Sequence, residues 1–454
     1  MEKEEQNSRR SFLKTAATGA LIAAVTPTTL SAQVTKPVII PASAKGANDR
    51  IRVAVAGING RGKSHIETIM ELAGNGNVEV VTLCDPDMNL LRDRAKSFED
   101  KYGRKVAIEQ DFRKVLDDKD IDAVTLATPN HWHALQTVWA CQAGKDVYVE
   151  KPATHNIYEG KKIVEAAYKY NRIVQHGVQL RSSVAIREAV KHLEEGLIGR
   201  VYMARGLVFR SRPDIGNKGI SRTPTGLNYD LWCGPAPMRP FTEDLVHYNW
   251  HWHWDYGNGD VGNQGIHETD LCMWGLGVDS LPERITSMGG KFLWDDSKEV
   301  PEIQTSIYHY PKEKKIIQFE VRNWYTNLED GAGVGNIFYG DKGYLVVNGY
   351  GTYESFLGPK REKGPSRKEG GELTLHFQNW FDAIRARDMS IQNGPVQTGA
   401  LSSSLAHLGN VSYRLGKQLQ FDPVAERFIG DSEAEANSML SRDYRAPYLL
   451  PEVV

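Results

Sequence analysis

The chain is poor in cysteine, nearly neutral in net charge and free of long apolar runs. Its only cysteines among 454 residues are Cys84, Cys141, Cys233 and Cys272, and no two of them have a CxxC spacing. This scarcity excludes a disulfide scaffold and a zinc knuckle, and we expect free thiols. A formal net charge of −2 gives no indication of nucleic-acid binding. The hydrophobic content of 41% and the length are sufficient for two domains with sizeable cores.

The first fifty residues have the organisation of an export signal. The twin-arginine motif is matched by Ser8-Arg9-Arg10-Ser11-Phe12-Leu13-Lys14, and an apolar run from Ala16 to Val25 follows it. That run is too short for a transmembrane helix, which needs about 20 apolar residues. We therefore expect a signal peptide over residues 1–32, a linker over residues 33–50, and a periplasmic or otherwise exported protein with no membrane contact beyond export.

A strand, a glycine-containing turn and a helix follow in the order that dinucleotide binding requires. The strand is Ile51 to Ala56, and the helix covers Ser64 to Ala73. Between them lies Gly57-Ile58-Asn59-Gly60-Arg61-Gly62-Lys63, in which Asn59 takes the place of the second glycine of GxGxxG. Such a turn directs a helix N-terminus toward a pyrophosphate. The cofactor contacts expected from the turn are Gly57, Asn59, Gly60, Arg61 and Gly62.

The next strand, Val78 to Cys84, ends at an acidic residue, Asp85. A carboxylate there accepts hydrogen bonds from the adenosine ribose diol and repels a 2′-phosphate, so it indicates NAD, with NADP the less favoured cofactor. A helix from Met88 to Tyr102 follows, and further strands at Val106 to Ile108 and Ile121 to Thr128 are separated by a helix from Phe112 to Leu116. This alternation predicts a parallel, doubly wound sheet.

The strand that starts at Asp146 ends in Glu150-Lys151-Pro152. Pro152 cannot donate to a strand ladder, so it ends the strand and leaves Lys151 at its carboxyl end. Ligands bind at that edge of open α/β sheets, and a partly buried lysine has a lowered pKa and can move a proton. A surface lysine after a strand is the alternative interpretation.

These segments together resemble the glucose-fructose oxidoreductase, inositol dehydrogenase and rhizopine-catabolism family, abbreviated Gfo/Idh/MocA. The resemblance extends from Ile51 to about Asp422. The matching segments are Ala54-Val55-Ala56-Gly57 through Gly62, Cys84-Asp85, Ala127-Thr128-Pro129-Asn130-His131 and Glu150-Lys151-Pro152. The resemblance implies an α/β protein with an N-terminal Rossmann domain (51–175), a C-terminal α+β domain with a large, mostly antiparallel sheet (176–425) and a tail (426–454).

The resemblance also implies roles for individual residues. Cofactor contacts are implied for Thr128, Asn130, His131, Glu150 and Lys151. Lys151, held by Glu150, would take the proton of a substrate hydroxyl while a hydride leaves a sugar or cyclitol carbon. The family has Asp and His one helical turn apart, where this chain has Asn263 and His267. His267 fits an acid/base role or a satisfied helix histidine, and Asp260 or Asp270 could supply the missing charge. A homodimer or homotetramer is implied as well.

Polar and aromatic residues of the second half are candidates for carbohydrate binding. The run from His247 to Tyr256 alternates Trp with His, which in a strand would place the tryptophans on one face. Aromatic faces with a few polar groups suit sugars. Zinc at His251 and His253 is the rival interpretation, but no further ligand is evident and we expect no metal. The expected substrate contacts are Gln179, Arg181, Tyr229, Trp232, Trp252, Trp254, Asn263 and His267.

Three functions remain open. The first is an NAD-dependent oxidoreductase that acts on a sugar, glycoside or cyclitol hydroxyl with a tightly bound, recycled cofactor, because free NAD is not expected outside the cytoplasm. The second is redox-neutral glycoside cleavage, which needs an additional base that the sequence does not identify. The third is a non-catalytic carbohydrate or nucleotide binder. We also expect surface loops at Arg210 to Tyr229 and at Pro359 to Gly371, and an irregular tail after Phe421.

Overall fold

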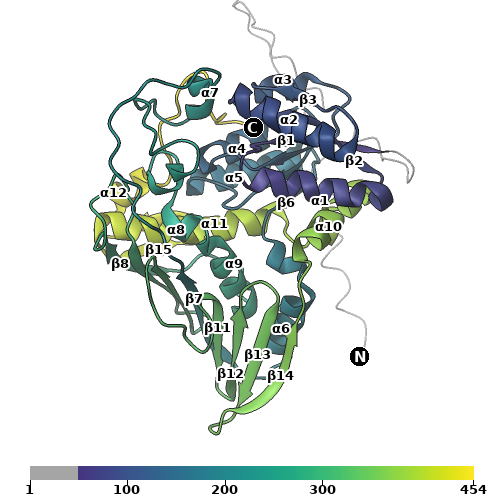
Figure 1. Cartoon of the computed structure of the whole chain (residues 1–454). Helices are drawn as coiled ribbons and strands as arrows, with labels where there is room; N and C mark the ends of the chain where they lie inside the picture. Colours follow the sequence, from purple (N-terminus) through teal and green to yellow (C-terminus); the bar gives the residue numbers. More distant parts are fainter. Residues whose placement is uncertain (1–49) are drawn as a thin grey trace, which may run out of the picture. The chain divides into compact units, whose positions relative to one another are not determined.

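The computed structural model describes residues 50–454, and these residues contain two sheets (Figure 1). The expected signal peptide and the linker up to residue 49 lie outside the described residues. The first sheet has six parallel strands in the order β3-β2-β1-β4-β5-β6. Its strands are β1 (Ile51–Ala56), β2 (Val78–Cys84), β3 (Ala107–Glu109), β4 (Ala123–Leu126), β5 (Asp146–Val149) and β6 (Val174–His176). The predicted doubly wound parallel sheet is confirmed.

Alternate residues of the central strand β1 enter two separate apolar cores. Val53 and Val55 pack on one face with α1 (Arg61–Gly76), α2 (Met88–Tyr102) and α10 (Glu372–Ala386). Ala54 and Ala56 pack on the other face with α3 (Phe112–Asp117), α4 (Asn130–Gln142) and α5 (Ile157–Lys169). Because successive side chains of a strand point to opposite faces, an uninterrupted apolar strand requires helices on both sides of the sheet.

The second sheet has ten strands in the order β14-β13-β12-β11-β7-β10-β9-β8-β15-β16. Every neighbouring pair is antiparallel except β7 and β10, which are parallel. The strands are β7 (Val201–Phe209), β8 (Arg284–Gly290), β9 (Ile303–Tyr310), β10 (Lys315–Arg322), β11 (Val334–Gly340), β12 (Gly343–Asn348), β13 (Thr352–Leu357), β14 (Glu362–Lys368), β15 (Leu419–Asp422) and β16 (Arg427–Ile429). The expected large, mostly antiparallel sheet is confirmed.

Helices cover one face of this second sheet. The principal core of the domain combines strand residues with α6 (Val184–Glu194), α9 (Gly265–Leu276) and α11 (Val396–Leu415). Helix α11 packs against both α5 and β8, so it connects the layers of the two sheets (Figure 1). The remaining short helices are η1 (Gln179–Ser182), α7 (Tyr229–Cys233), η2 (Asn249–Trp252), α8 (Gly259–Gly262), η3 (Met389–Ile391) and α12 (Glu433–Ser438).

Three local expectations need correction. The Trp/His run is a helical turn, η2, and not a strand, so its tryptophans do not share one face. The segment 359–371 contains strand β14, whose exposed, charged residues are typical of a sheet edge. The chain after Phe421 forms β16 and α12 before it becomes irregular. The expected loop after β7 is confirmed, since no helix or strand forms before Tyr229.

Distant parts of the chain complete the core around β5. Tyr148 of β5 stacks on Phe377 of α10, with ring centroids 4.3 Å apart and an interplanar angle of 11°. Trp380 meets the same tyrosine edge-on at 5.7 Å. On the opposite face, Tyr448 and Val454 of the tail join the core of α4 and α5. The strand that carries Lys151 is therefore supported by segments more than two hundred residues away in the chain.

All four cysteines are buried and unpaired. Within residues 50–454, no helix is both long and apolar enough to cross a bilayer.

We expect Trp380→Ala to lower the free energy of unfolding by about 3–5 kcal/mol, because removal of a buried aromatic side chain leaves a cavity. Urea unfolding followed by circular dichroism measures this change. Leu375→Ala on the same helix is the matched control, since Leu375 is 42% exposed. An equal loss in both variants would contradict the packing role of Trp380.

Candidate active site

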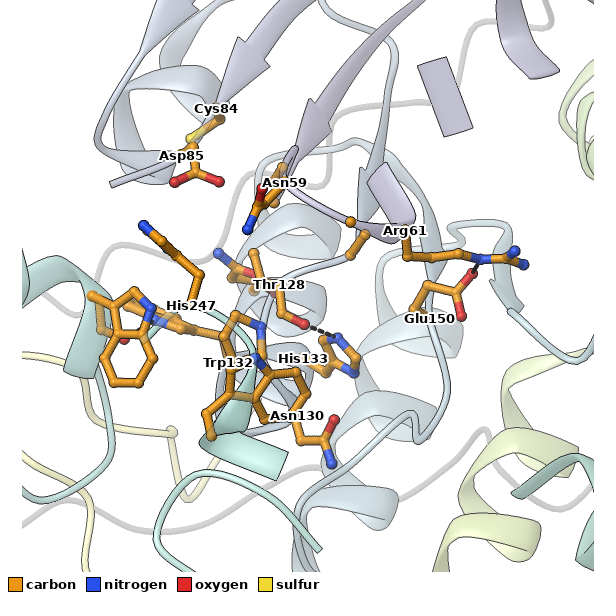
Figure 2. Close-up of a pocket in the computed structure, with 18 of the residues that line it drawn as sticks. Asn59, Arg61, Cys84, Asp85, Thr128, Asn130, Trp132, His133, Glu150 and His247 are labelled. Atoms are coloured by element: carbon orange, nitrogen blue, oxygen red, sulfur yellow. Dashed lines mark hydrogen bonds and ion pairs between the residues drawn. The ribbon is translucent and has the colours of Figure 1, made fainter. Parts of the chain in front are cut away.

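One cavity of about 360 Å³ lies at the carboxyl ends of the parallel strands and is also lined by residues of the second half of the chain (Figure 2). It contains most of the residues that the sequence predicts. Those that line it are Gly57, Asn59, Gly60, Arg61, Asp85, Thr128, Asn130, Glu150, Lys151, Gln179, Trp232, Asn263 and His267. The edge of the sheet at which parallel strands end is where α/β folds bind ligands.

The glycine turn is shaped by close backbone contacts and leaves one side open. A Cβ on Gly57, whose φ is +78°, would lie 2.5 Å from the Ala127 carbonyl carbon. A Cβ on Gly62 would lie 1.9 Å from the Gly57 carbonyl oxygen, so Gly62 supports the turn from behind the cavity. Gly60 lines the cavity and caps α1 without a side-chain hydrogen bond. The N–H groups of the first turn of α1 thus fit an anion such as a pyrophosphate.

Asp85 provides the acidic group at the end of β2. Its carboxylate oxygens accept from the backbone N–H groups of Ile58 and Asp87, each at 3.1 Å. Burial raises the pKa of Asp85 to about 6, although both backbone donors oppose the shift. Each oxygen keeps a second lone pair, so the group can also accept from a ribose diol. This geometry fits NAD better than a cofactor with a 2′-phosphate.

Glu150 is a buried carboxylate held by two groups of α1. Its Oε1 accepts from Arg61 Nε at 2.7 Å, the pair drawn with a dashed line in Figure 2, and from His65 Nε2 at 2.9 Å. Burial alone would raise the pKa of Glu150, but the Arg61 guanidinium and the His65 ring hold it well below its usual value. Glu150 is therefore a fixed negative charge next to Lys151.

Lys151 directs its amine toward the start of α9. Nζ donates to the backbone oxygen of Asn263 at 2.8 Å and to its side-chain oxygen at 3.1 Å. Burial lowers the pKa of Lys151 to about 8, against the opposing effect of Glu150. A sizeable fraction of the amine is then neutral near neutral pH and can accept a proton.

Three buried polar atoms of residues that line the cavity lack partners among the described residues. They are Nδ1 of His267 in α9, Oε1 of Gln179 in η1 and Nη2 of Arg61 in α1. Burial and the Lys151 ammonium hold the pKa of His267 well below its usual value, so its ring is neutral. Buried polar atoms are almost always paired, so unpaired ones that line a cavity point to a ligand.

Six predicted residues lie outside the cavity lining: Gly62, His131, Arg181, Tyr229, Trp252 and Trp254. The His131 ring contacts the backbone oxygens of Tyr256 and Trp232, because α4 begins at Asn130 and turns the ring away. The Arg181 guanidinium donates to Asp270 at 2.7 and 3.0 Å.

Aromatic contacts account for the other three residues that face away from the cavity. Trp252 lies under the Arg212 guanidinium at 5.2 Å, and Trp254 lies under that of Arg414 at 5.1 Å. Tyr229 stacks on Trp232, with ring centroids 5.7 Å apart.

Several lining residues were not among the predicted contacts. Tyr350, in the turn between β12 and β13, lies 5.3 Å from the His267 ring, and its hydroxyl accepts from Gln264 at 2.7 Å. His247, Trp250 and His251 line the cavity from the irregular segment after α7. No local pattern could identify Tyr350, because only the pairing of the second sheet brings it to the site. Within residues 50–454, no group of three or more His, Cys, Asp or Glu side chains is arranged to hold a metal ion.

The chain matches known families over well over half of its length. Residues 51–178 match the family described as "Oxidoreductase family, NAD-binding Rossmann fold". Residues 214–317 and 368–450 match "Oxidoreductase family, C-terminal alpha/beta domain".

Curated relatives are similar over shorter stretches. Levoglucosan dehydrogenase of Pseudarthrobacter phenanthrenivorans is 38% identical over 96 residues, 21% of this chain and 25% of that protein. Inositol 2-dehydrogenase of Salmonella typhimurium is 28% identical over 157 residues, 34% of this chain and 45% of that protein. A glycosyl hydrolase family 109 protein of Shewanella pealeana is 32% identical over 172 residues, 35% and 37% of the two chains. The matches span from a quarter to less than half of these relatives.

Solved structures share the fold over most of the chain. Levoglucosan dehydrogenase in complex with NADH and levoglucosan aligns with a TM-score of 0.63 and 18% identity, over 82% of this chain and 99% of that chain. The aldose-aldose oxidoreductase from Caulobacter crescentus, complexed with glycerol, has a TM-score of 0.63 and 16% identity, over 82% and 100%.

Fold and site together define a two-domain, dinucleotide-dependent oxidoreductase class. The chain belongs to the Gfo/Idh/MocA oxidoreductase family, and its first domain is an NAD-binding Rossmann fold. The resemblance found in the sequence and the expectation of NAD are thereby confirmed.

We expect Gly60→Ala to bind NAD about tenfold more weakly, a cost of about 1.4 kcal/mol, because a methyl group would separate the phosphates from the turn. Thermal stability should not fall, since an added Cβ meets no atom within 4 Å. Calorimetric titration of cofactor-stripped protein measures the affinity. Gly74→Ala is the control, because Gly74 is on the same helix and outside the cavity lining. An unchanged affinity of Gly60→Ala for NAD would show that the phosphates of the cofactor do not lie against Gly60.

Proposed function

We propose that the protein is an NAD-dependent oxidoreductase that acts on a hydroxyl of a sugar, glycoside or cyclitol. The observation that carries this proposal is the position of Lys151. Lys151 is half-buried, its amine has a pKa lowered to about 8, and it shares one cavity with the glycine turn and the unpartnered polar atoms of His267 and Gln179. Alcohol oxidation requires a proton acceptor, an NAD-binding turn and polar groups that are free to bind the hydroxyls of the substrate.

In this proposal Lys151 takes the proton of the substrate hydroxyl. Asn263 orients the amine through two acceptor oxygens, and Glu150 provides the nearby negative charge that stabilises the ammonium once it forms. Bound NAD would supply the hydride acceptor, with Gly57, Gly60 and Asp85 among the residues that would hold it. His267 and Gln179 would bind neighbouring hydroxyls, because each presents an unpaired polar atom.

A carbohydrate is the substrate class that this lining suits best. Trp250 and Tyr350 present aromatic rings among neutral polar groups, the combination that sugar sites use. The relatives named for levoglucosan and inositol, both polyhydroxylated rings, support the same class. Redox-neutral glycoside cleavage is the second candidate, favoured by the similarity to a glycosyl hydrolase family 109 protein.

We further propose that the cofactor is retained rather than exchanged. A strap, defined as residues 224–248, crosses the adenosine end of the cavity. Within it, His247 contacts Asp87 at 3.1 Å. The Met88 N–H donates to Gly226 O at 3.0 Å, and the Asn228 N–H donates to Pro86 O at 2.9 Å. A retained cofactor agrees with export to the periplasm by the twin-arginine route. That route carries folded proteins, and free NAD is not expected in the periplasm.

Assembly into a homodimer or homotetramer completes the proposal. The face of the second sheet opposite the helices carries its own apolar cluster, centred on Leu207, Ile337 and Val346. Tyr344 and Phe356 stack beside it, with ring centroids 4.8 Å apart. Leu207, Ile337 and Val346 are already buried within the chain, so the half-buried rings of Tyr344 and Phe356 are the part of this face that a second copy of the chain would cover.

Replacing Lys151 by methionine tests the function. We expect reduction of bound NAD by substrate to fall by about 10²–10⁴-fold, the usual contribution of a general base. Wild-type turnover should rise with pH and level off above about 8, because the neutral amine is the active form. The absorbance of reduced nicotinamide follows the reaction, and the mass of released cofactor verifies that NAD is still bound. Undiminished turnover would reject the assignment.

Replacing His247 by alanine tests retention. We expect NAD to dissociate about tenfold faster, because one hydrogen bond to a charged group is worth about 1.5–3 kcal/mol. The cofactor content after timed gel filtration measures the loss. Lys218→Ala is the control, since its exposed ion pair with Glu243 joins the strap to the preceding loop away from the cavity. Equal NAD content in the wild type, His247→Ala and Lys218→Ala would show that the strap does not slow the dissociation of NAD.

A further inference from the structure

His251 is one of four histidines that line the cavity, with His133, His247 and His267. It lies in η2 and is buried, and its ring stacks on Trp250 with centroids 3.6 Å apart and an interplanar angle of 21°. The Lys151 ammonium is one of the charges that act on it. The oxidation described above uses Lys151, His267 and Gln179 and gives His251 no task.

The hydrogen bond at one ring nitrogen fixes the tautomer of His251. Nδ1 lies 2.5 Å from the backbone oxygen of Tyr248. Because a carbonyl oxygen can only accept, Nδ1 carries the hydrogen and Nε2 presents a lone pair. No hydrogen bond to Nε2 forms among the described residues, and Nε2 is not among the buried atoms sealed from solvent. Burial, together with the Lys151 ammonium, lowers the pKa to about 3 and keeps this lone pair free.

Of the two neighbouring histidines His251 and His253, only His251 lines the cavity. His253 lies two residues further along, outside the cavity lining, and its Nδ1 is 3.7 Å from Glu299. The helical turn of η2 separates the two rings, so that one faces the cavity and the other faces an ion-pair cluster. The cavity thus contains one proton acceptor more than alcohol oxidation requires.

We propose that His251 is a second catalytic residue that removes the proton from the carbon adjacent to the oxidised carbon. The inference rests on the proposed function, since a ketone must first form to acidify that C–H bond. The proton passes to Nε2, and the electron pair of the C–H bond moves toward the ketone oxygen. The Lys151 ammonium, which carries the former hydroxyl proton, stabilises the oxyanion that results.

This step leads to cleavage when the next carbon carries a glycosidic oxygen. The electron pair then forms a carbon–carbon double bond, the C–O bond breaks, and the departing alkoxide takes the proton from His251. Water adds across the double bond, its hydroxyl to the former glycosidic carbon and a proton to the adjacent carbon. Return of the hydride and of the Lys151 proton restores the alcohol. The balance is glycoside plus water to sugar plus alcohol, with no net redox change.

Solvent deuterium tests the proposal on the full chain with its retained NAD. The protein is incubated with a panel of methyl hexopyranosides in D₂O, nuclear magnetic resonance locates deuterium in the recovered sugar, and absorbance follows reduced nicotinamide. Wild-type protein should introduce deuterium at the carbon next to the oxidised one. In His251→Asn the ratio of deuterium exchange to nicotinamide reduction should fall about 100-fold. Asparagine can still donate to Tyr248, and His251→Gln serves if that variant is unstable.

His253→Asn is the matched control and should keep the wild-type ratio. Reduction without deuterium uptake in the wild type would overturn the role of His251 and leave the oxidoreductase intact. A wild-type ratio in His251→Asn would overturn it as well. If no sugar of the panel reduces bound NAD, the proposed function is rejected. The inference about His251 is then rejected as well, because it rests on that function.

Discussion

A buried carboxylate, Glu150, connects the two binding elements of the site. Its partners Arg61 and His65 lie one turn apart on α1, directly after the glycine turn, and Lys151 follows it in the chain. A buried charge costs several kcal/mol unless it is paired, so α1 and the end of β5 can occupy only a narrow range of relative positions. The distance between the cofactor turn and the lysine amine is therefore fixed by one ion pair.

The replacement of a family carboxylate by Asn263 has a definite electrostatic consequence. Asn263 offers Lys151 two neutral acceptors, whereas a carboxylate there would stabilise the ammonium and raise its pKa. The two acidic residues that could have compensated each pair with an arginine, Asp260 with Arg212 at 2.7 Å and Asp270 with Arg181 at 2.7 Å, and of the two only Asp260 is among the charges that raise the pKa of Lys151. The substitution leaves Glu150 as the principal counter-charge and keeps more of the amine neutral.

Much of the fold and the nucleotide half of the site could be predicted from local patterns. The apolar run of β1, the glycine turn and the Glu150-Lys151-Pro152 strand end each depend on neighbours in the chain, and parallel pairing gathers them at one sheet edge. The substrate half could be predicted only in part: Gln179, Trp232, Asn263 and His267 line the cavity, whereas Arg181, Tyr229, Trp252 and Trp254 do not. Tyr350 and His251 reach the cavity through the pairing of β12 with β13 and through a helical turn in an irregular segment. Alternating Trp and His cannot distinguish such a turn from a strand.

The charge pattern of the cavity favours a neutral ligand next to the nicotinamide end. Two arginines near this end are already paired with carboxylates, Arg61 with Glu150 and Arg212 with Asp260. Burial keeps the rings of His251 and His267 neutral, so each offers a lone pair and not a positive charge. Among the Lys and Arg residues that line the cavity in the described part of the chain, only the partly protonated Lys151 lacks a carboxylate at ion-pair distance, so desolvation of an anionic substrate would cost more than its contacts return. A polyol loses little on transfer, because each hydroxyl can replace water on an acceptor that the protein leaves open.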